Sequence, residues 1–268
     1  MLTGTRLPSR FGRTAVVVFL LLCITSQPSN ATEGFYVGGA IGGEYADVDF
    51  KKSVGRILPD TPVAFASSES DAQDWVGSFK VVLGHRWNLS ERTYLSGEVD
   101  AALRLDDSIT GFLEGVIDTQ NPDGNVFPGN WYLDKNHSVG FNAKLGYSPE
   151  EISFLGEGGS VYVIAGIQWL DMDVNSAHEG TLLNGEKLVG EYGKNLSAIP
   201  WLAGGGIEIG GKRGRLDLRA IYTRYDADFR VEEVNTPDLR YDLRYEYEVS
   251  EWGVYLGYIW SLGFGLGT

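Results

Sequence analysis

The stretch that decides the fold is WGVYLGYIWSLGFGLGT, from Trp252 to Thr268. No charged residue interrupts it, and large apolar side chains stand at every second position as far as Phe264. Mostly small residues, including Gly253 and Gly257, stand between them. This period of two is typical of a β-strand whose two faces meet different surroundings. The bulky face predicts contact with a wide apolar medium, and the small face predicts a narrow, crowded interior.

The chain begins with the layout of a secretory signal peptide. Arg6, Arg10 and Arg13 precede the apolar run 15–24, and a polar stretch leads to Ala31. The apolar run is about ten residues long, whereas a membrane-spanning helix needs about twenty, which argues against a transmembrane anchor. We therefore expect cleavage after Ala31. Residues 1–31 are then the signal peptide, and residues 32–268 form one barrel domain.

Composition excludes several classes of protein. Cys23 is the only cysteine and lies in the expected signal peptide, so the mature chain should carry neither thiol nor disulfide. The full chain has 22 basic and 36 acidic residues and a net charge of −14. Removing three arginines leaves 19 basic residues and a net charge of −17. This acidity argues against nucleic acid as a partner.

Period two recurs after Ala31 in eight segments rich in Tyr, Trp, Val and Gly. We expect strands at roughly 34–50, 73–89, 92–110, 137–149, 159–175, 196–211, 214–230 and 241–262. The third is the clearest, because Leu95, Val99 and Leu103 share one face while Glu98 and Asp100 share the other. The pattern predicts an all-β fold, an eight-stranded antiparallel up-and-down transmembrane β-barrel.

Three features favour a membrane barrel over a soluble sandwich. Opposite the apolar face, glycines mix with charges of both signs, as in a narrow closed interior. The expected connections alternate between short ones near 88–91, 149–158 and 210–214 and long ones near 51–72, 111–136, 176–195 and 231–240, as in outer-membrane barrels with both termini in the periplasm. Aromatic residues lie near strand ends on the apolar face, as interfacial girdles require: Phe35, Trp75, Trp87, Tyr94, Tyr147, Trp169, Trp201, Tyr222, Trp252 and Trp260.

Three motifs resemble the small eight-stranded outer-membrane barrels of Gram-negative bacteria, such as the OmpA transmembrane domain, OmpX and the opacity-like "porin family" proteins. GFYVGGAIG, from Gly34, is similar to the first strand of that superfamily, and IPWLAGGGIEIG, from Ile199, to its sixth. YLGYIWSL resembles the C-terminal assembly signal, with Gly257, Trp260 and Leu262 in the expected places. The chain departs from the pattern in continuing past Leu262 with GFGLGT. The resemblance implies outer-membrane lipid, lipopolysaccharide and the barrel assembly machinery as partners, and a monomer.

Charged residues on the expected inward faces are the candidate functional set. Buried charges persist when they are paired, and five acids against six bases approach balance. The set predicts a lumen closed by a charge network, because eight strands leave an interior just wide enough for side chains, and a gate or ion path is the alternative. The residues are Glu44, Glu98, Asp100, Glu208, Asp217, Lys80, Arg86, Arg104, Lys144, Arg215 and Arg219.

Other chemistry finds less support in the sequence. A lipid A-modifying enzyme would need a dyad such as His137 and Ser138, but adjacent residues of a strand point to opposite faces. The acid pairs Asp171/Asp173 and Asp226/Asp228 could share a calcium ion, although solvated strand ends account for them equally well. The glycine runs lack the helix that a phosphate loop requires. We expect no catalytic residue, cofactor or metal.

The sequence therefore predicts a non-enzymatic outer-membrane barrel with a charge-plugged lumen. It would support envelope integrity and bind an unidentified extracellular ligand through acidic loops. A narrow passive channel for small solutes is the first alternative, and the lipid A-modifying enzyme is the second.

Overall fold

The computed structural model describes residues 33–58, 61–105, 108–116, 126–149, 152–156, 159–181, 187–211, 213–236 and 239–262. The expected signal peptide and its cleavage site at Ala31 lie outside these residues and remain predictions. Within them, no helix is long and apolar enough to cross a membrane.

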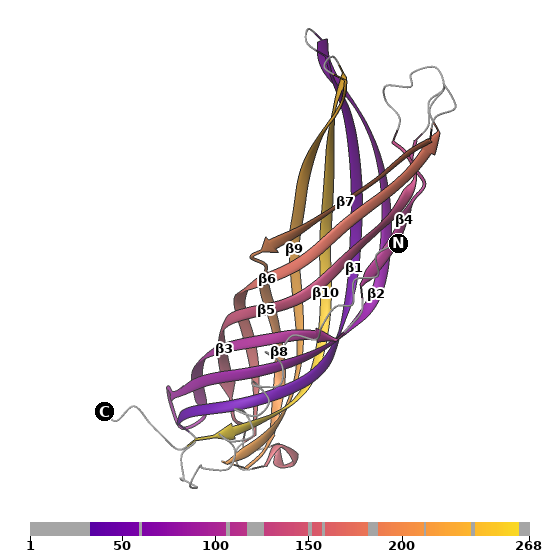
Figure 1. The fold of residues 1–268 in the computed structure, drawn as a ribbon. Coiled ribbons are helices and arrows are strands. Elements are labelled where there is room, and N and C mark those ends of the chain that lie inside the picture. Colours follow the sequence, from indigo (N-terminus) through magenta and orange to yellow (C-terminus); the bar gives the residue numbers. More distant parts are fainter. Residues whose placement is uncertain are drawn as a thin grey trace.

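Ten antiparallel strands and one 3₁₀ turn, η2 (Ser153–Leu155), make up the described fold (Figure 1). Eight strands form a closed ring in the order β1-β2-β3-β5-β6-β8-β9-β10, because β5 pairs with β6 and β10 pairs with β1. The eight-stranded up-and-down barrel is thus confirmed. The strands are β1 (Gly34–Leu58), β2 (Thr61–Asn88), β3 (Thr93–Leu105), β4 (Ile109–Leu113), β5 (Gly129–Tyr147), β6 (Ser160–Thr181), β7 (Lys187–Ala198), β8 (Trp201–Gly210), β9 (Gly214–Thr236) and β10 (Leu239–Ser261).

The pairing register fixes the tilt of the barrel. Directly paired residues lead around the ring from Phe35 back to β1 at Tyr45, ten positions further along the strand. A shear of ten residues at about 3.3 Å, against eight strands spaced about 4.8 Å apart, corresponds to a tilt of about 40°. That tilt gives a narrow barrel whose interior is filled by side chains.

The outer face of the barrel is an apolar belt. Four exposed tryptophans form a girdle at one end of the belt: Trp75, Trp169, Trp201 and Trp252. Trp87 lies at the other end, and these five side chains are between 40% and 57% exposed. The predicted orientation of one girdle residue is wrong. Tyr94 points inward and is only 2% exposed, because it shares its alternation with Glu98 rather than with Leu95.

The expected long connections are largely strands, which corrects the predicted boundaries. Residues 51–58 and 61–72 continue β1 and β2 as a paired ladder, and residues 231–236 and 239–240 continue β9 and β10 as another. Segment 111–136 contains the end of β4 and the start of β5, and segment 176–195 contains the end of β6 and most of β7. The exposed outer face becomes polar in these extensions, so their hydropathy resembles that of loops.

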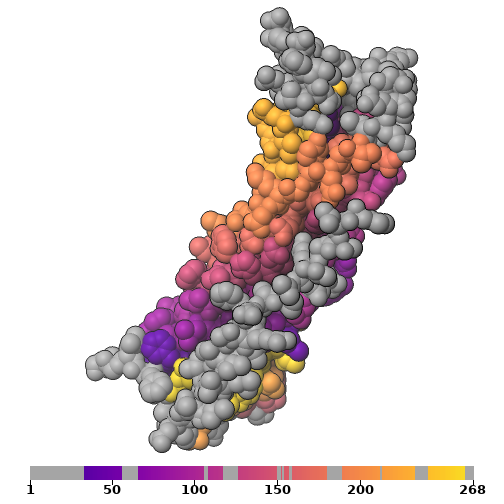
Figure 2. All heavy atoms as spheres, viewed as in Figure 1, coloured from indigo at the N-terminus to yellow at the C-terminus, as the bar shows by residue number. Residues whose placement is uncertain are grey.

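Beyond the girdle the ring divides into two sheets. β2 pairs with β3 only as far as Gly77 opposite Leu105, and β8 pairs with β9 only as far as Trp201 opposite Arg224. From these points β2, β1, β10 and β9 continue as one sheet, and β4, β5, β6 and β7 as another (Figure 1). We call this part the distal sandwich, and the opposite end, where Tyr36 pairs with Ser261, the terminal rim. Figure 2 shows that barrel and sandwich form one elongated body.

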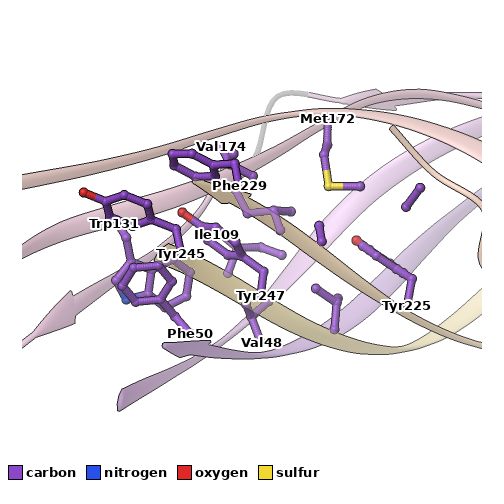
Figure 3. Packing of buried hydrophobic residues seen from close by; sticks show 14 of the residues in the cluster. Val48, Phe50, Ile109, Trp131, Met172, Val174, Tyr225, Phe229, Tyr245 and Tyr247 are labelled. Atoms are coloured by element: carbon purple, nitrogen blue, oxygen red, sulfur yellow. The ribbon is translucent and has the colours of Figure 1, made fainter. Parts of the chain in front are cut away.

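An apolar core fills the distal sandwich (Figure 3). Phe50 of β1 stacks on Trp131 of β5, with ring centroids 5.1 Å apart. The Trp131 indole donates a hydrogen bond to Ser70 of β2 at 2.8 Å, and the Tyr247 hydroxyl donates one to the backbone oxygen of Asn175 at 3.3 Å. Each of these contacts joins one sheet to the other, so the core holds the two sheets together.

The terminal rim carries the short connections that the sequence predicts. Strands β2 and β3, β5 and β6, and β8 and β9 are joined there, and β10 ends beside the start of β1. The amide of Leu262 still donates a hydrogen bond to the carbonyl oxygen of Phe35, at 2.8 Å. The described part of β10 ends at Ser261, and GFGLGT lies outside the described residues.

The distal sandwich should weaken in acid because of His178. This residue of β6 is 6% exposed inside the sandwich and stacks on Tyr192 of β7, and the charge of Lys52 of β1 acts on it. Burial, and secondarily Lys52, lower its pKa to about 4. Because this is below the usual value of about 6.5, the stability that neutral His178 contributes is present above pH 6.5 and lost as pH falls through 4.

We expect the urea midpoint of near-ultraviolet circular dichroism to fall between pH 7 and pH 4. His178→Phe keeps an aromatic ring without the titration and should show a smaller fall than the parent chain. Equal falls in the two proteins would contradict a role for His178 in this pH dependence.

Candidate functional site

Inside the barrel, four tyrosines lie across glycines of neighbouring strands. Tyr36 is paired with Gly84, Tyr94 with Gly146, Tyr162 with Gly206, and Tyr255 with Gly42. A methyl group added at Gly84 would lie 2.3 Å from the ring of Tyr36, and the other three glycines are covered equally closely. The small inward face of the strands is therefore the surface on which these rings rest.

The tyrosines connect the barrel wall to the charged residues. Tyr36 donates a hydrogen bond to Glu98 at 2.8 Å, and Tyr162 donates one to Asp217 at 2.6 Å. The Lys144 ammonium lies over the Tyr162 ring, 4.3 Å from its centroid. In the same way, the Arg86 guanidinium lies over the ring of Tyr94, and the Lys80 ammonium lies over the ring of Tyr255. Each ring thus offers its hydroxyl to a polar partner, and three of the four also offer a π-face to a cation.

Glu208 of β8 is the centre of a charged cluster near the terminal rim. It pairs with Arg86 of β2, with Arg215 of β9 at 3.1 Å, and with Lys144 of β5 at 3.6 Å. Ser160 donates a further hydrogen bond at 3.2 Å. The carboxylate is 1% exposed, so its charge is balanced by neighbouring cations rather than by water.

Glu98 of β3 links that cluster to the opposite wall. It pairs with Lys144 at 2.6 Å and with Arg219 of β9 at 3.3 Å. Arg219 in turn pairs with Asp217 of the same strand. β3 and β9 lie opposite each other in the ring, so the Glu98–Arg219 pair spans the interior.

A second cluster closes the barrel at the girdle. Glu44 of β1 accepts bonds from Arg104 at 3.1 Å and Lys135 at 2.9 Å, and Lys135 also reaches Glu251 at 2.8 Å. The sequence analysis missed Lys135 and Glu251. Lys135 lies in the expected loop 111–136 and faces inward because of a bulge between it and His137. Glu251 shares the inward alternation of Gly253 and could have been found from that parity.

The structure places the side chains of all eleven predicted charged residues inside the barrel. Nine of them take part in the two clusters. Lys80 instead lies over the ring of Tyr255, 3.8 Å from its centroid, and Asp100 accepts a hydrogen bond from Asn142. With Lys135 and Glu251 added, seven bases face six acids.

The outer side of the girdle holds the remaining predicted candidates. His137 is exposed and lies against Trp169, whereas Ser138 points inward and is bound by Arg104, so the barrel wall separates them. Asp171 and Asp173 both accept hydrogen bonds from Asn136 and Asn195. Among the described residues, no group of three or more His, Cys, Asp or Glu side chains is placed to hold a metal ion.

The residues of the expected assembly signal lie at the C-terminal end of β10, where this strand pairs with the start of β1. Gly257 faces inward beside Ala40, and Trp260 faces outward with 37% of its surface exposed. Leu262 follows the strand at the terminal rim. Their recognition by assembly machinery remains a prediction.

The closed ring, the apolar belt and the charged interior together identify the fold. The fold is that of an outer-membrane β-barrel. No family model and no curated protein matches the sequence.

Solved structures with a similar arrangement are outer-membrane proteins. The protease OmpT of Escherichia coli has a TM-score of 0.42 and 7% identity, covering 86% of this chain and 99% of that one. Neisserial surface protein A scores 0.31 with 14% identity, covering 79% and 96%. The attachment invasion locus protein Ail of Yersinia pestis scores 0.28 with 10% identity, covering 81% and 99%.

Gly84→Ala should destabilise the barrel, although it adds a single methyl group. The new carbon would collide with the ring of Tyr36, which must move away from Glu98. Overpacking of this kind typically costs about 1–3 kcal/mol. Gly97→Ala is the matched control, because its methyl group would lie 3.6 Å from Trp87 on the outer face. Urea titration followed by gel mobility measures both, and equal midpoints would contradict the importance of the tyrosine–glycine contact.

Arg219→Ala should lower the unfolding midpoint more than Leu218→Ala, its outward-facing neighbour. The arginine variant leaves Glu98 and Asp217 short of a buried cation, and breaking such a pair typically costs about 3–5 kcal/mol. Leu218 is 43% exposed, so its truncation removes mainly lipid contact. Urea titration of both variants in the same detergent tests this, and a larger loss at Leu218 would contradict it.

Proposed function

We propose that this protein is a non-enzymatic outer-membrane barrel that is closed to solutes and holds a rigid acidic sandwich outside the cell. The observation that carries the proposal is the continuous filling of the interior. Charged clusters occupy the part inside the belt, and an apolar core occupies the part beyond it. The anchored sandwich would support envelope integrity and bind external partners.

Two layers of different chemistry oppose passage along the axis. A solute would first have to separate ion pairs whose side chains are nearly inaccessible to solvent, as at Lys135 and Lys144. It would then have to cross the aromatic packing around Phe50 and Trp131. In the first layer, passage is opposed by the cost of breaking buried ion pairs. In the second, an ion would have to lose its water among apolar side chains.

The orientation follows from the connections. Short turns and both ends of the ring lie at the terminal rim, as at the periplasmic side of outer-membrane barrels. The long hairpins of the sandwich lie at the other end. We therefore place the sandwich outside the cell and both termini in the periplasm.

The outer face of the β2-β1-β10-β9 sheet is strongly acidic. Asp71, Asp49, Glu248 and Asp226 are exposed and stand directly opposite one another across the four strands. Directly opposed like charges destabilise a sheet, and this exposed row attracts cations at the same time. Arg224 approaches Glu248, at 3.6 Å, without balancing the row. A cationic protein segment or divalent ions bridging to lipopolysaccharide would complement this face.

The two alternatives find less support in the geometry. A passive channel would need an open path through both layers. A lipid A-modifying enzyme built on His137 and Ser138 would need both on one side of the wall. A catalytic set of other composition is not identified among the described residues.

Bilayer recording tests the closed lumen. The parent chain should show no steady conductance in planar bilayers after folding is verified by heat-dependent gel mobility. Arg219→Ala disturbs the charged layer alone, Phe50→Ala the apolar layer alone, and both single variants should stay closed because the layers act in series. The double variant should conduct. A large, steady conductance of the parent chain would overturn the proposal and support the channel.

A further inference from the structure

A shallow groove crosses the outer face of the barrel. Gly97, Ala143 and Ala165 face outward and stand directly opposite one another on β3, β5 and β6. The neighbouring row is large, with Leu83, Val99, Phe141 and Ile167 forming one wall, and Trp87 stands at the other side. The groove has a volume of about 750 Å³. It lies wholly within the apolar belt, so its surroundings are membrane lipid.

A buried histidine with no partner lies at one end of this groove. His85 of β2 is paired with Gly97, the first small residue of the row, and lines the groove. Phe35 and Trp87 cover its two sides, with ring centroids 4.6 and 4.5 Å away. The residue is 7% exposed, and neither ring nitrogen has a hydrogen-bond partner. An unpaired imidazole buried among apolar groups costs free energy unless a ligand supplies polar atoms.

We propose that the groove binds one glycerophospholipid of the surrounding leaflet. One acyl chain lies along Gly97, Ala143 and Ala165, and the ester region meets His85. A neutral imidazole has one donor and one acceptor, so its N–H donates to an ester carbonyl oxygen and its other nitrogen accepts from an ammonium headgroup. Phosphatidylethanolamine supplies both groups.

The position of His85 agrees with this occupant. It lies opposite Phe35, the second residue of β1, and therefore at the terminal rim, where the belt ends. Lipid ester groups are found at the boundary of the hydrocarbon layer, and lipid tails extend from it. The small-residue row runs across strands that tilt by about 40°, so it climbs from the boundary into the hydrocarbon region. A chain lying in the row follows the same course.

The groove is also continuous with a surface that already contacts lipid. Association within a membrane depends on close packing and on polar groups, because lipid tails are as apolar as the protein surface. Small residues allow an acyl chain to approach the backbone, and the large row beside them adds contact along its length. His85 adds a polar group at the end of this row.

Native mass spectrometry can detect the retained lipid. The full chain is folded in vesicles of phosphatidylethanolamine and phosphatidylglycerol, transferred to a mild detergent, and measured for bound phosphatidylethanolamine. The parent chain should keep one lipid. Ala165→Leu fills the groove and should lower the occupancy roughly fivefold. Ala101→Leu adds the same side chain on the outward face of β3, outside the groove, and should retain the parent occupancy.

The imidazole is tested separately. His85→Phe keeps an aromatic ring and removes both nitrogens, so it should lower the occupancy of phosphatidylethanolamine while leaving the groove open. Nitrogen-15 spectra of the ring can be assigned readily, because the chain has only three histidines. The His85 signals should differ between ester-linked and ether-linked phosphatidylethanolamine, whereas those of His137 and His178 should not.

Three outcomes would overturn the proposal. Equal losses in Ala165→Leu and Ala101→Leu would mean ordinary lipid contact without a site. Unchanged occupancy in His85→Phe would remove the role of the imidazole. A dimer seen by sedimentation in the parent chain and abolished by Ala165→Leu would assign the groove to a second copy of the protein.

Discussion

Along β1 and β10 one alternation continues while the surroundings of the outer face change from lipid to water, and the rest of the structure depends on this change. On β5 the bulge before His137 shifts the alternation at the same level. On β10, Trp252 and Leu256 face lipid, and Glu246 and Glu248 continue the same outward row in water. The inward row changes in the opposite direction, from Glu251 and Tyr255 in the barrel to Tyr245 and Tyr247 in the sandwich. The chain is therefore an outward-apolar barrel joined to an inward-apolar sandwich, and the pairing of β1 with β10 runs unbroken through both.

Backbone chemistry explains where one architecture gives way to the other. Inside lipid an unpaired peptide group has no water to bind, so the sheet must close into a ring. The two seams open at Gly77–Leu105 and at Trp201–Arg224, both close to the tryptophan girdle. Beyond the girdle water can satisfy strand edges, and an apolar core between two sheets replaces closure as the stabilising requirement. The closed ring thus extends about as far as the lipid-facing part of the strands, where unpaired edges would have no water to bind.

Sequence reasoning found what depends on alternation alone. The eight strands, their lipid faces and the charged inward residues all follow from period two. Tyr94 was nevertheless assigned to the wrong face, although it shares the alternation of Glu98, and the bulge before His137 hid Lys135. The extended hairpins were read as loops because the apolar–polar contrast reverses above the girdle. The tyrosine–glycine pairs join residues on different strands, so only the pairing register could reveal them.

Register also explains how a narrow barrel holds so many charges. The inward glycines leave space that the four tyrosines fill by lying flat against the wall, which brings hydroxyls and π-faces to the cations and carboxylates. A carboxylate such as Glu98 then has Tyr36, Lys144 and Arg219 as partners instead of water. Replacing the glycines with larger residues would push the rings toward the axis and separate these contacts. These four glycines, Gly42, Gly84, Gly146 and Gly206, therefore matter for the rings that they allow to lie against them, more than for their own flexibility.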